Sequence, residues 1–253
     1  MNQEAHTDAA GGYGPEESLM GRSVMVTGGN RGIGLAVATA LAADGDQVAV
    51  THRDAPPPDG LLGVRAEMTD SQSIDAAFEK AEAAHGPVEV LVVNAGITRD
   101  TLFLRMDERD FTDVVDVNLH GAFRTMRRAV RGMVRARWGR IVLISSMTYA
   151  YGAPGQVNYG AAKAGMLGMA RSLAWELGPR NITVNIVAPG LIDTDMSRGI
   201  TDRRREHLLA ITPLGRAGEV ADVAAAVRFL AGDSGRFITG AVLPVSGGLG
   251  LGG

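Results

Sequence analysis

The sequence contains no cysteine, and this absence excludes several kinds of site. Without thiols the chain can form neither disulfide bonds nor cysteine-ligated metal centres, and we expect no metal site. No apolar run approaches the ~18 residues that a membrane span needs. The N-terminus has acidic residues and glycines but no basic or apolar segment, so we expect no secretory signal there. These absences favour a cytoplasmic protein.

Lysine is nearly absent as well. Of the 25 Lys and Arg residues only Lys80 and Lys163 are lysines, so a lysine marks a position where arginine does not serve. Lys163 follows Tyr159 by four residues, a spacing that places both side chains on one face of a helix. The pair suits proton donation, although the same spacing is also consistent with an ordinary surface pair.

The remaining composition is that of a globular protein. The 253 residues are 45% hydrophobic and 21% charged, and the net charge of −3 gives no reason to expect nucleic acid as a partner. We expect a flexible N-terminal tail over residues 1–20 and one domain over residues 21–253.

Short apolar segments alternate with helical ones along the chain. This alternation predicts an α/β fold, a single doubly wound Rossmann-type domain whose parallel seven-stranded sheet has helices on both faces. Ser71 is the expected N-cap of the second helix. Residues 193–210 are polar, rich in arginine and broken by Gly199, as in a mobile lid. The expected strands are 23–26, 47–51, 61–64, 88–93, 140–144, 182–187 and 241–245; the expected helices are 35–43, 71–84, 107–135, 156–177 and 220–231.

A glycine-rich turn, Thr27 to Gly34, joins the first strand to the first helix. Glycines let the backbone approach a ligand closely, and the N–H groups at the start of a helix attract a phosphate. The spacing is GxxxGxG rather than GxGxxG. The turn therefore has the physical properties of a dinucleotide-binding loop but not its sequence pattern. A purely structural turn is the alternative.

Two further strand ends carry residues suited to a cofactor. The second strand ends without the acid that usually binds the ribose of NAD, and Arg53 follows it. Together with Arg31 of the glycine turn, Arg53 suits the 2′-phosphate of NADP, unless both are simply solvated surface charges. Asn94-Ala95-Gly96 ends the fourth strand with small residues and an amide, which suit a cofactor ring or ribose.

These motifs resemble, in order and spacing, those of the short-chain dehydrogenase/reductase family. Within the family the chain is most similar to the 3-oxoacyl-[acyl-carrier-protein] reductases, and in particular to the mycobacterial mycolic-acid ketoreductases. The resemblance covers essentially the whole chain after residue 20. It rests on Thr27-Gly28, Gly32, Gly34, Asn94-Ala95-Gly96, Asn118, Ser146, Tyr159, Lys163 and Pro189-Gly190.

The resemblance implies four catalytic roles. Tyr159 would be the general acid that protonates a ketone oxygen, and Lys163 would hold the nicotinamide ribose and lower the pKa of the phenol. Ser146 would donate a hydrogen bond to the carbonyl oxygen, and Asn118 would anchor a water in a proton relay.

The resemblance also implies the cofactor contacts. Glu67 stands where the family usually has an aspartate for the adenine amino group, and Met68 follows it. The full set of expected NADP contacts is Gly28, Asn30, Arg31, Gly32, Ile33, Gly34, Arg53, Glu67, Met68, Asn94, Ala95, Gly96, Tyr159, Lys163, Pro189, Gly190, Ile192 and Thr194.

The activity implied by the resemblance is NADPH-dependent reduction of a 3-oxoacyl thioester on acyl carrier protein, in fatty acid biosynthesis, by a homotetramer. Met147, Tyr151 and Met196 would contact the acyl chain, unless they are simple packing residues. Arg137 and Arg180 would attract the acidic carrier protein beside the mouth of the active site. The arginines between 124 and 140 are equally consistent with a solvated helix face.

Two alternatives stay open at this point. The same site could act on acetoacetyl-CoA, a polyketide, a quinone or a secondary alcohol. A non-catalytic NADP-binding regulator is the other alternative, and it predicts loss of at least one of the four catalytic residues.

Overall fold

The computed structural model describes residues 21–250, so the predicted N-terminal tail lies outside the described residues. Its centre is a seven-stranded sheet in which every pair of neighbours is parallel, in the order β3-β2-β1-β4-β5-β6-β7. The predicted fold class is therefore confirmed. The strands are β1 Ser23–Val26, β2 Gln47–His52, β3 Leu62–Arg65, β4 Val90–Val93, β5 Gly139–Ile144, β6 Ile182–Pro189 and β7 Val242–Val245.

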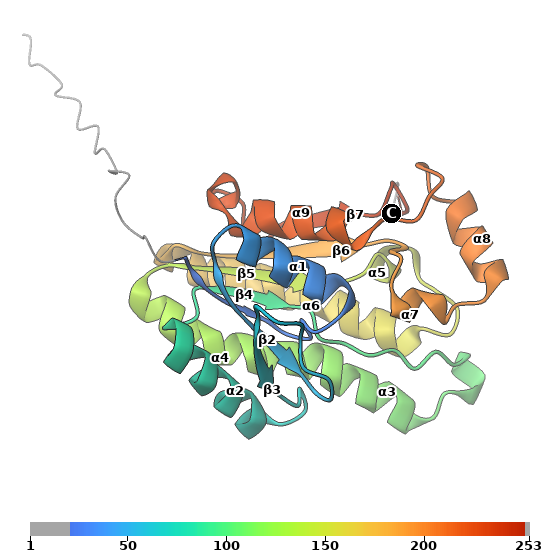
Figure 1. Ribbon diagram of the computed structural model, residues 1–253. Coiled ribbons are helices and arrows are strands. Elements are labelled where there is room, and N and C mark those ends of the chain that lie inside the picture. The colour runs from blue at the N-terminus through green and yellow to red at the C-terminus, as the bar shows by residue number, and fades with distance from the viewer. Residues whose placement is uncertain (1–20, 251–253) are drawn as a thin grey trace, which may run out of the picture.

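Helices cover both faces of this sheet (Figure 1). The main helices are α1 Gly32–Ala43, α2 Ser71–His85, α3 Glu108–Val115, α4 Gly121–Ala136, α5 Thr148–Tyr151, α6 Val157–Leu177, α7 Asp195–Arg198, α8 Asp202–Ala210 and α9 Val220–Ala231. Short 3-10 turns are η1 Phe103–Arg105, η3 Gly178–Arg180 and η4 Asp233–Gly235, and η2 Asp116–His120 is a π-helical turn. Among the described residues, no helix is both long and apolar enough to cross a membrane.

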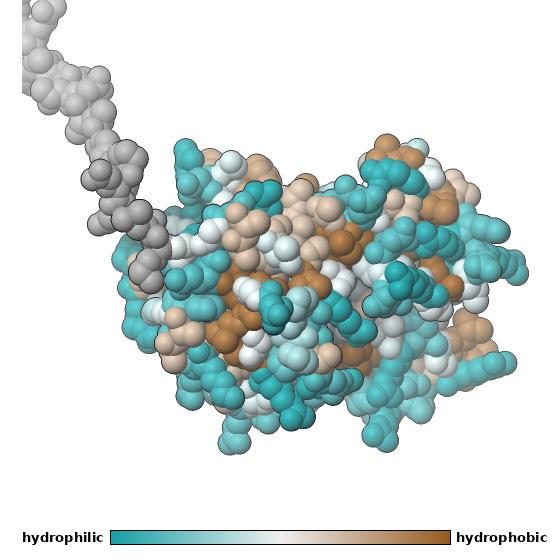
Figure 2. Space-filling view, viewed as in Figure 1, coloured by the Kyte–Doolittle hydropathy of each residue, from teal (hydrophilic) through white to brown (hydrophobic). Residues whose placement is uncertain are grey.

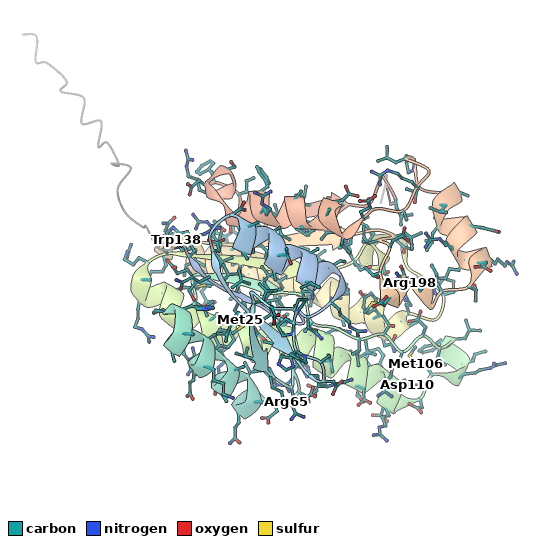
Figure 3. The ribbon with its side chains drawn as sticks, in the orientation of Figure 1. Met25, Arg65, Met106, Asp110, Trp138 and Arg198 are labelled. Atoms are coloured by element: carbon teal, nitrogen blue, oxygen red, sulfur yellow. The ribbon has the colours of Figure 1, made fainter. Side chains whose placement is uncertain are left out.

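The strands bury side chains in two cores, because successive residues of a strand point to opposite faces. Val24 and Val26 of β1 face α1 and α9, where they join Val37 and Leu41. Met25, between them, faces the other way and packs in the core under α2, α4 and α6 (Figure 3). Both faces of β1 are therefore apolar, as expected for a buried parallel strand.

The strand order reverses at β1, which lies between β2 and β4. The chain goes from β1 to β2 on one side and later returns to β4 on the other side. In parallel sheets of this kind a ligand binds beyond the carboxyl ends of the strands at such a switch point. We therefore expect a ligand-binding site at the carboxyl ends of β1 and β4.

Several predicted details of the elements are wrong. Ser71 does not cap α2: the N-cap is Asp70, whose side chain accepts a hydrogen bond from the Gln72 N–H. The single helix predicted over 107–135 is α3, the π-helical η2 and α4 in succession. β4 begins two residues later than predicted. The segment expected to be a lid, residues 193–210, contains α7 and α8, with Gly199 ending α7, and its mobility stays a prediction.

Candidate active site

The glycine turn after β1 brings backbone very close to backbone. Gly28 has a φ of 62°, a conformation that side chains rarely tolerate. A Cβ at Gly34 would collide with the Gly28 carbonyl oxygen and with the Asn94 side-chain nitrogen. The turn leads into the N-terminus of α1, whose first turn contains no acidic residue. The first turn therefore adds no negative charge of its own beside the free N–H groups of that helix end, which suits a pyrophosphate.

Hydrogen bonds fix this turn to the end of β4. Asn94 Nδ2 donates to the carbonyl oxygens of Thr27 and Gly28, both at 3.0 Å. The Thr27 hydroxyl oxygen in turn accepts from the backbone N–H groups of Asn94 and Ala95, at 2.9 and 3.0 Å. The carboxyl ends of β1 and β4 are thus held together at the switch point, and these residues fit a dinucleotide.

The two arginines expected at the 2′-phosphate lie at the surface of the protein. Arg31 and Arg53 are exposed. Arg53 Nε lies 3.0 Å from Asp54 Oδ2, and this hydrogen bond raises the pKa of Arg53, with a smaller contribution from Glu67. The Asn30 side chain donates to the Ala55 carbonyl oxygen. Met68 is buried, while Glu67 is half-buried.

Asn118 is placed by the π-helical turn η2. Its side chain is fully buried, where Oδ1 accepts from the Ile97 N–H at 2.9 Å and Nδ2 donates to the Ile97 carbonyl at 2.8 Å. A Cβ at Gly96 would collide with Asn118 Oδ1, so Gly96 is needed for this approach. π-helical turns are frequently found at functional sites. Asn118 thus fixes the loop after β4, and its role in anchoring a water stays a prediction.

Tyr159 and Lys163 lie on α6, one turn apart. Lys163 is buried and its Nζ donates to the Ile144 carbonyl oxygen at 2.8 Å, while lying 5.5 Å from the centre of the Tyr159 ring. Burial lowers the pKa of Lys163 to about 8. We expected Lys163 to lower the pKa of Tyr159. Instead, burial raises the pKa of Tyr159 to about 12, and a hydrogen bond with Ser146 acts in the opposite direction.

Ser146 follows β5, whose carboxyl end is adjacent to that of β4. Its hydroxyl donates to Thr148 Oγ1 at 3.0 Å and accepts from the Thr148 N–H at 3.2 Å. The neighbouring Met147 N–H donates to the Pro189 carbonyl at the end of β6. The structure thus brings Asn118, Ser146, Tyr159 and Lys163 to the carboxyl ends of β4 and β5.

The end of β6 and the base of the lid lie on the same side. Gly190 follows Pro189 and contacts Ser246 so closely that a Cβ would collide with it. Ile192 is buried and forms a bridge with Gly218. Thr194 caps α7, and its methyl group is the neighbour nearest to a Cβ built at Gly32 of the glycine turn.

The residues predicted for the acyl chain differ in their exposure. Tyr151 and Met196 are exposed, by 36% and 51%, on α5 and α7. Met147 is 4% exposed, and Gly250 lies against its methyl group. Only Tyr151 and Met196 therefore present apolar surface to solvent in this structure.

Arg137 and Arg180 do not lie beside the proposed active site of their own chain, and their contact with a carrier protein stays a prediction. Both are exposed, and Arg137 donates to the carbonyl oxygen of Pro179, next to Arg180. Yet Arg137 precedes β5 and Arg180 precedes β6, so both lie at the amino edge of the sheet. Trp138, adjacent to Arg137, and Arg198 of the lid lie at opposite ends of the molecule (Figure 3). The order of these residues along the chain already indicates this, because both arginines precede a predicted strand whereas Ser146 and Gly190 follow one.

Four polar residues around the site were not predicted from the sequence. Asp100, Thr148, Gln156 and Arg204 come from four different segments and form hydrogen bonds with one another. Each alone is an ordinary polar residue in a loop or on a helix. Only their tertiary contacts distinguish them, so no short motif could have found them.

The fold and site define a dinucleotide-binding oxidoreductase of the α/β class. A family model described as Enoyl-(Acyl carrier protein) reductase matches residues 28–250. The chain is 50% identical over 249 residues to 3-oxoacyl-[acyl-carrier-protein] reductase MabA of Mycobacterium avium, covering 98% of this chain and 97% of that one. The same comparison gives 51% identity over 239 residues with MabA of Mycobacterium tuberculosis, covering 94% and 97%. For 3-oxoacyl-[acyl-carrier-protein] reductase FabG of Escherichia coli it gives 44% over 237 residues, covering 90% and 97%.

The chain therefore belongs to the short-chain dehydrogenase/reductase family, as its motifs predicted. It is an oxidoreductase, and reductases of this family use a nicotinamide cofactor. The alternative of a non-catalytic regulator has no support, because all four residues of the predicted catalytic set are present and lie together.

Proposed function

We propose that this protein reduces a 3-oxoacyl thioester on acyl carrier protein to the 3-hydroxyacyl thioester, with NADPH as cofactor, in fatty acid biosynthesis. The single observation that carries the proposal is the 50% identity, over nearly the whole of both chains, to a 3-oxoacyl-[acyl-carrier-protein] reductase. The cluster of Ser146, Tyr159 and Lys163 at the carboxyl end of the sheet supports it. We further propose that residues from 21 onward act as one NADP-binding domain of a cytoplasmic homotetramer.

The proposed chemistry needs a proton donor beside a carbonyl group. NADPH, when bound, supplies a hydride to the carbonyl carbon. The phenol of Tyr159, with its pKa raised to about 12, is fully protonated at neutral pH and is ready to donate to the oxygen. The alkoxide oxygen that forms is a much stronger base than a phenolate, so the proton transfer is downhill.

Ser146 and Lys163 support this transfer in different ways. The Ser146 hydroxyl stabilises the negative charge that develops on the carbonyl oxygen, as a fixed donor in a low-dielectric site does. Lys163, with its pKa lowered to about 8, is mostly charged at neutral pH and lies beneath the Tyr159 ring. Its ammonium has three donors, one of which goes to Ile144, so two remain for a ribose hydroxyl and for the phenolate.

The first test replaces Tyr159 by phenylalanine, which removes the donor and keeps the ring. We expect the rate of NADPH oxidation with acetoacetyl-CoA to fall by about 10²- to 10⁴-fold, because general acid catalysis contributes about that much. The absorbance of NADPH is followed over time with the wild type and the variant. Equal rates would contradict the catalytic assignment.

The true substrate is tested with a series of thioesters of increasing acyl length, on coenzyme A and on carrier protein. Higher kcat/KM with longer chains is expected, because Tyr151 and Met196 expose apolar surface near the site. Turnover of a simple secondary alcohol or a quinone, with none of any thioester, would favour the alternative substrates.

The choice of NADPH over NADH is tested through Arg31 and Arg53. Each arginine changed to alanine is expected to raise the KM for NADPH by about tenfold or more and to leave the KM for NADH unchanged, because only NADPH carries the 2′-phosphate. Arg65, an exposed arginine at the end of β3, serves as the control. A wild-type protein that oxidises NADH as fast as NADPH would overturn this assignment.

A further inference from the structure

One arginine of the lid contacts two loops beside Tyr159. Arg204 of α8 has its Nη1 atom 3.5 Å from Asp100 Oδ2, in the loop that follows β4. The same nitrogen lies 3.5 Å from the carbonyl oxygen of Pro154, in the loop between α5 and α6. The side chains of Arg204 and Asp100 are 26% and 36% exposed. Arg204 therefore connects the lid to both loops on either side of the site.

A series of hydrogen bonds connects Asp100 to Ser146 in the interior of the site. Its Oδ2 accepts from Gln156 Nε2 at 2.8 Å. Gln156 Oε1 accepts from Thr148 Oγ1 at 3.5 Å, and Thr148 Oγ1 accepts from Ser146 Oγ at 3.0 Å. A continuous chain of polar contacts thus runs from the lid to the hydroxyl group that is expected to bind the substrate carbonyl.

The direction of these hydrogen bonds is set from the Asp100 end. A carboxylate only accepts, so the Gln156 amide must turn its NH₂ group toward Asp100 and its oxygen toward Thr148. That oxygen also only accepts, so the Thr148 hydroxyl donates to it. Thr148 then has a lone pair left for the proton of Ser146. Each group in the chain is oriented by the one before it.

The Ser146 hydroxyl at the inner end can still reorient. Rotation of this hydroxyl alone turns its proton from Thr148 to a substrate carbonyl oxygen, while the Thr148 hydroxyl keeps donating to Gln156. The Ser146 oxygen keeps its position during this change because Thr148 is 6% exposed and its N–H also donates to Ser146 Oγ. The chain therefore positions the oxygen without blocking its function.

We propose that Arg204 is a latch that holds the lid closed on Asp100, and that Asp100, Gln156 and Thr148 are positioning residues that orient Ser146 when the latch is closed. The role of Ser146 rests on the proposed function, whereas the latch itself does not. Closure of the lid over the acyl chain and orientation of the carbonyl-binding hydroxyl are then one event. An isolated pair at the surface would contribute little by itself.

The latch is tested without any substrate by trypsin, because α8 contains three consecutive cleavage sites, Arg203, Arg204 and Arg205. Asp100→Asn removes the charge that holds Arg204 and leaves all three sites in place. We expect cleavage within α8 to become several-fold faster than in the wild type. The matched control is Asp195→Asn, which removes an ion pair within α7 and does not touch the loop after β4. Equal cleavage of wild type and Asp100→Asn would overturn the latch.

The link to Ser146 is tested by a double-mutant cycle with NADPH and acetoacetyl-CoA. Thr148→Val and Arg204→Gln are each expected to lower kcat by about tenfold, the worth of one or two neutral hydrogen bonds, and to leave the Kd for NADPH unchanged. The double variant is expected to be no slower than the slower single variant, because one break already disconnects the chain.

Two controls complete this experiment. Arg204→Lys keeps the charge and is expected to recover most of kcat, whereas Arg203→Gln, at an exposed neighbouring position, is expected to match the wild type. Losses that multiply in the double variant, or a kcat unchanged in either single variant, would overturn the positioning role. A wild type that reduces no 3-oxoacyl thioester would instead count against the proposed function. The trypsin experiment would still show whether Arg204 holds the lid on Asp100.

Discussion

Lys163 is the residue whose burial has the clearest energetic consequence. It is 2% exposed, it makes one hydrogen bond, and burial lowers its pKa from 10.5 to about 8. A shift of this size corresponds to about 3 kcal/mol of lost stability while the lysine is charged. The protein therefore keeps a charged group in a place where an apolar one would stabilise the fold better.

The corresponding prediction concerns Lys163→Met. Because the unfolded chain binds the proton more tightly, the wild type gains stability as pH rises from about 8 to 10.5. The variant lacks this gain. We expect the variant to be more stable by up to about 3 kcal/mol at pH 7, by much less near pH 10, and to be inactive. Urea unfolding of both proteins at the two pH values measures this, and a difference that does not change with pH would contradict it.

The proposed catalytic residues were chosen from the sequence because their order and spacing form a pattern. Ser146, Tyr159 and Lys163 lie together as expected from it. The pKa of Tyr159 could not be predicted, because it depends on burial rather than on the nearness of Lys163 in the sequence. Arg204 and Asp100, 104 residues apart, meet only through the folded chain.

At the scale of elements, the end of β1 and the end of β4 behave as one unit. The Asn94 side chain and the Thr27 hydroxyl connect them by four hydrogen bonds of 2.9 to 3.0 Å. The sequence predicted both strands and the glycine turn, because apolar runs and glycines mark them. It did not predict that η2 would interrupt a long helix, because the extra residue of a π turn leaves no clear mark in the apolar pattern.

Gly34→Ala tests how tightly this unit is packed. The added methyl group would collide with the Gly28 carbonyl and the Asn94 amide, and neither can move without breaking a hydrogen bond. We expect a loss of about 1 to 3 kcal/mol in unfolding free energy and weaker NADPH binding. Gly132→Ala in α4 is the control: it meets no atom within 4 Å and should stabilise the helix by about 0.5 to 1 kcal/mol. Equal unfolding free energies of the two variants would contradict the tight packing around Gly34.

At the scale of the whole molecule, large apolar side chains remain at the surface. Polar residues cover most of the face in Figure 2, with apolar patches between them. On α4 and α6, Phe123 is 50% exposed, Val157 43% and Trp175 88%. Exposed apolar surface of this kind is common where subunits meet. This supports the proposed tetramer, and we propose that α6 packs against its copy in it.

Trp175→Glu tests this assembly. A charge placed in an apolar contact is costly, so we expect the variant to elute as a smaller species than the wild type in size-exclusion chromatography with light scattering. Lys80→Glu, an exposed change of charge on α2, should leave the mass unchanged. Identical masses for the wild type and Trp175→Glu at all concentrations would exclude a contact through Trp175.

The position of Arg137 and Arg180 has a consequence for how a tethered substrate travels. Both lie at the amino edge of a sheet whose longest strand, β6, spans roughly 26 Å, with the catalytic residues beyond its other end. We propose that a carrier protein docked on these arginines delivers its acyl chain to the active site of a neighbouring subunit, because the site of the same chain lies beyond the far end of the sheet. Mixed assemblies of Tyr159→Phe and Arg180→Glu chains should then regain activity that neither has alone.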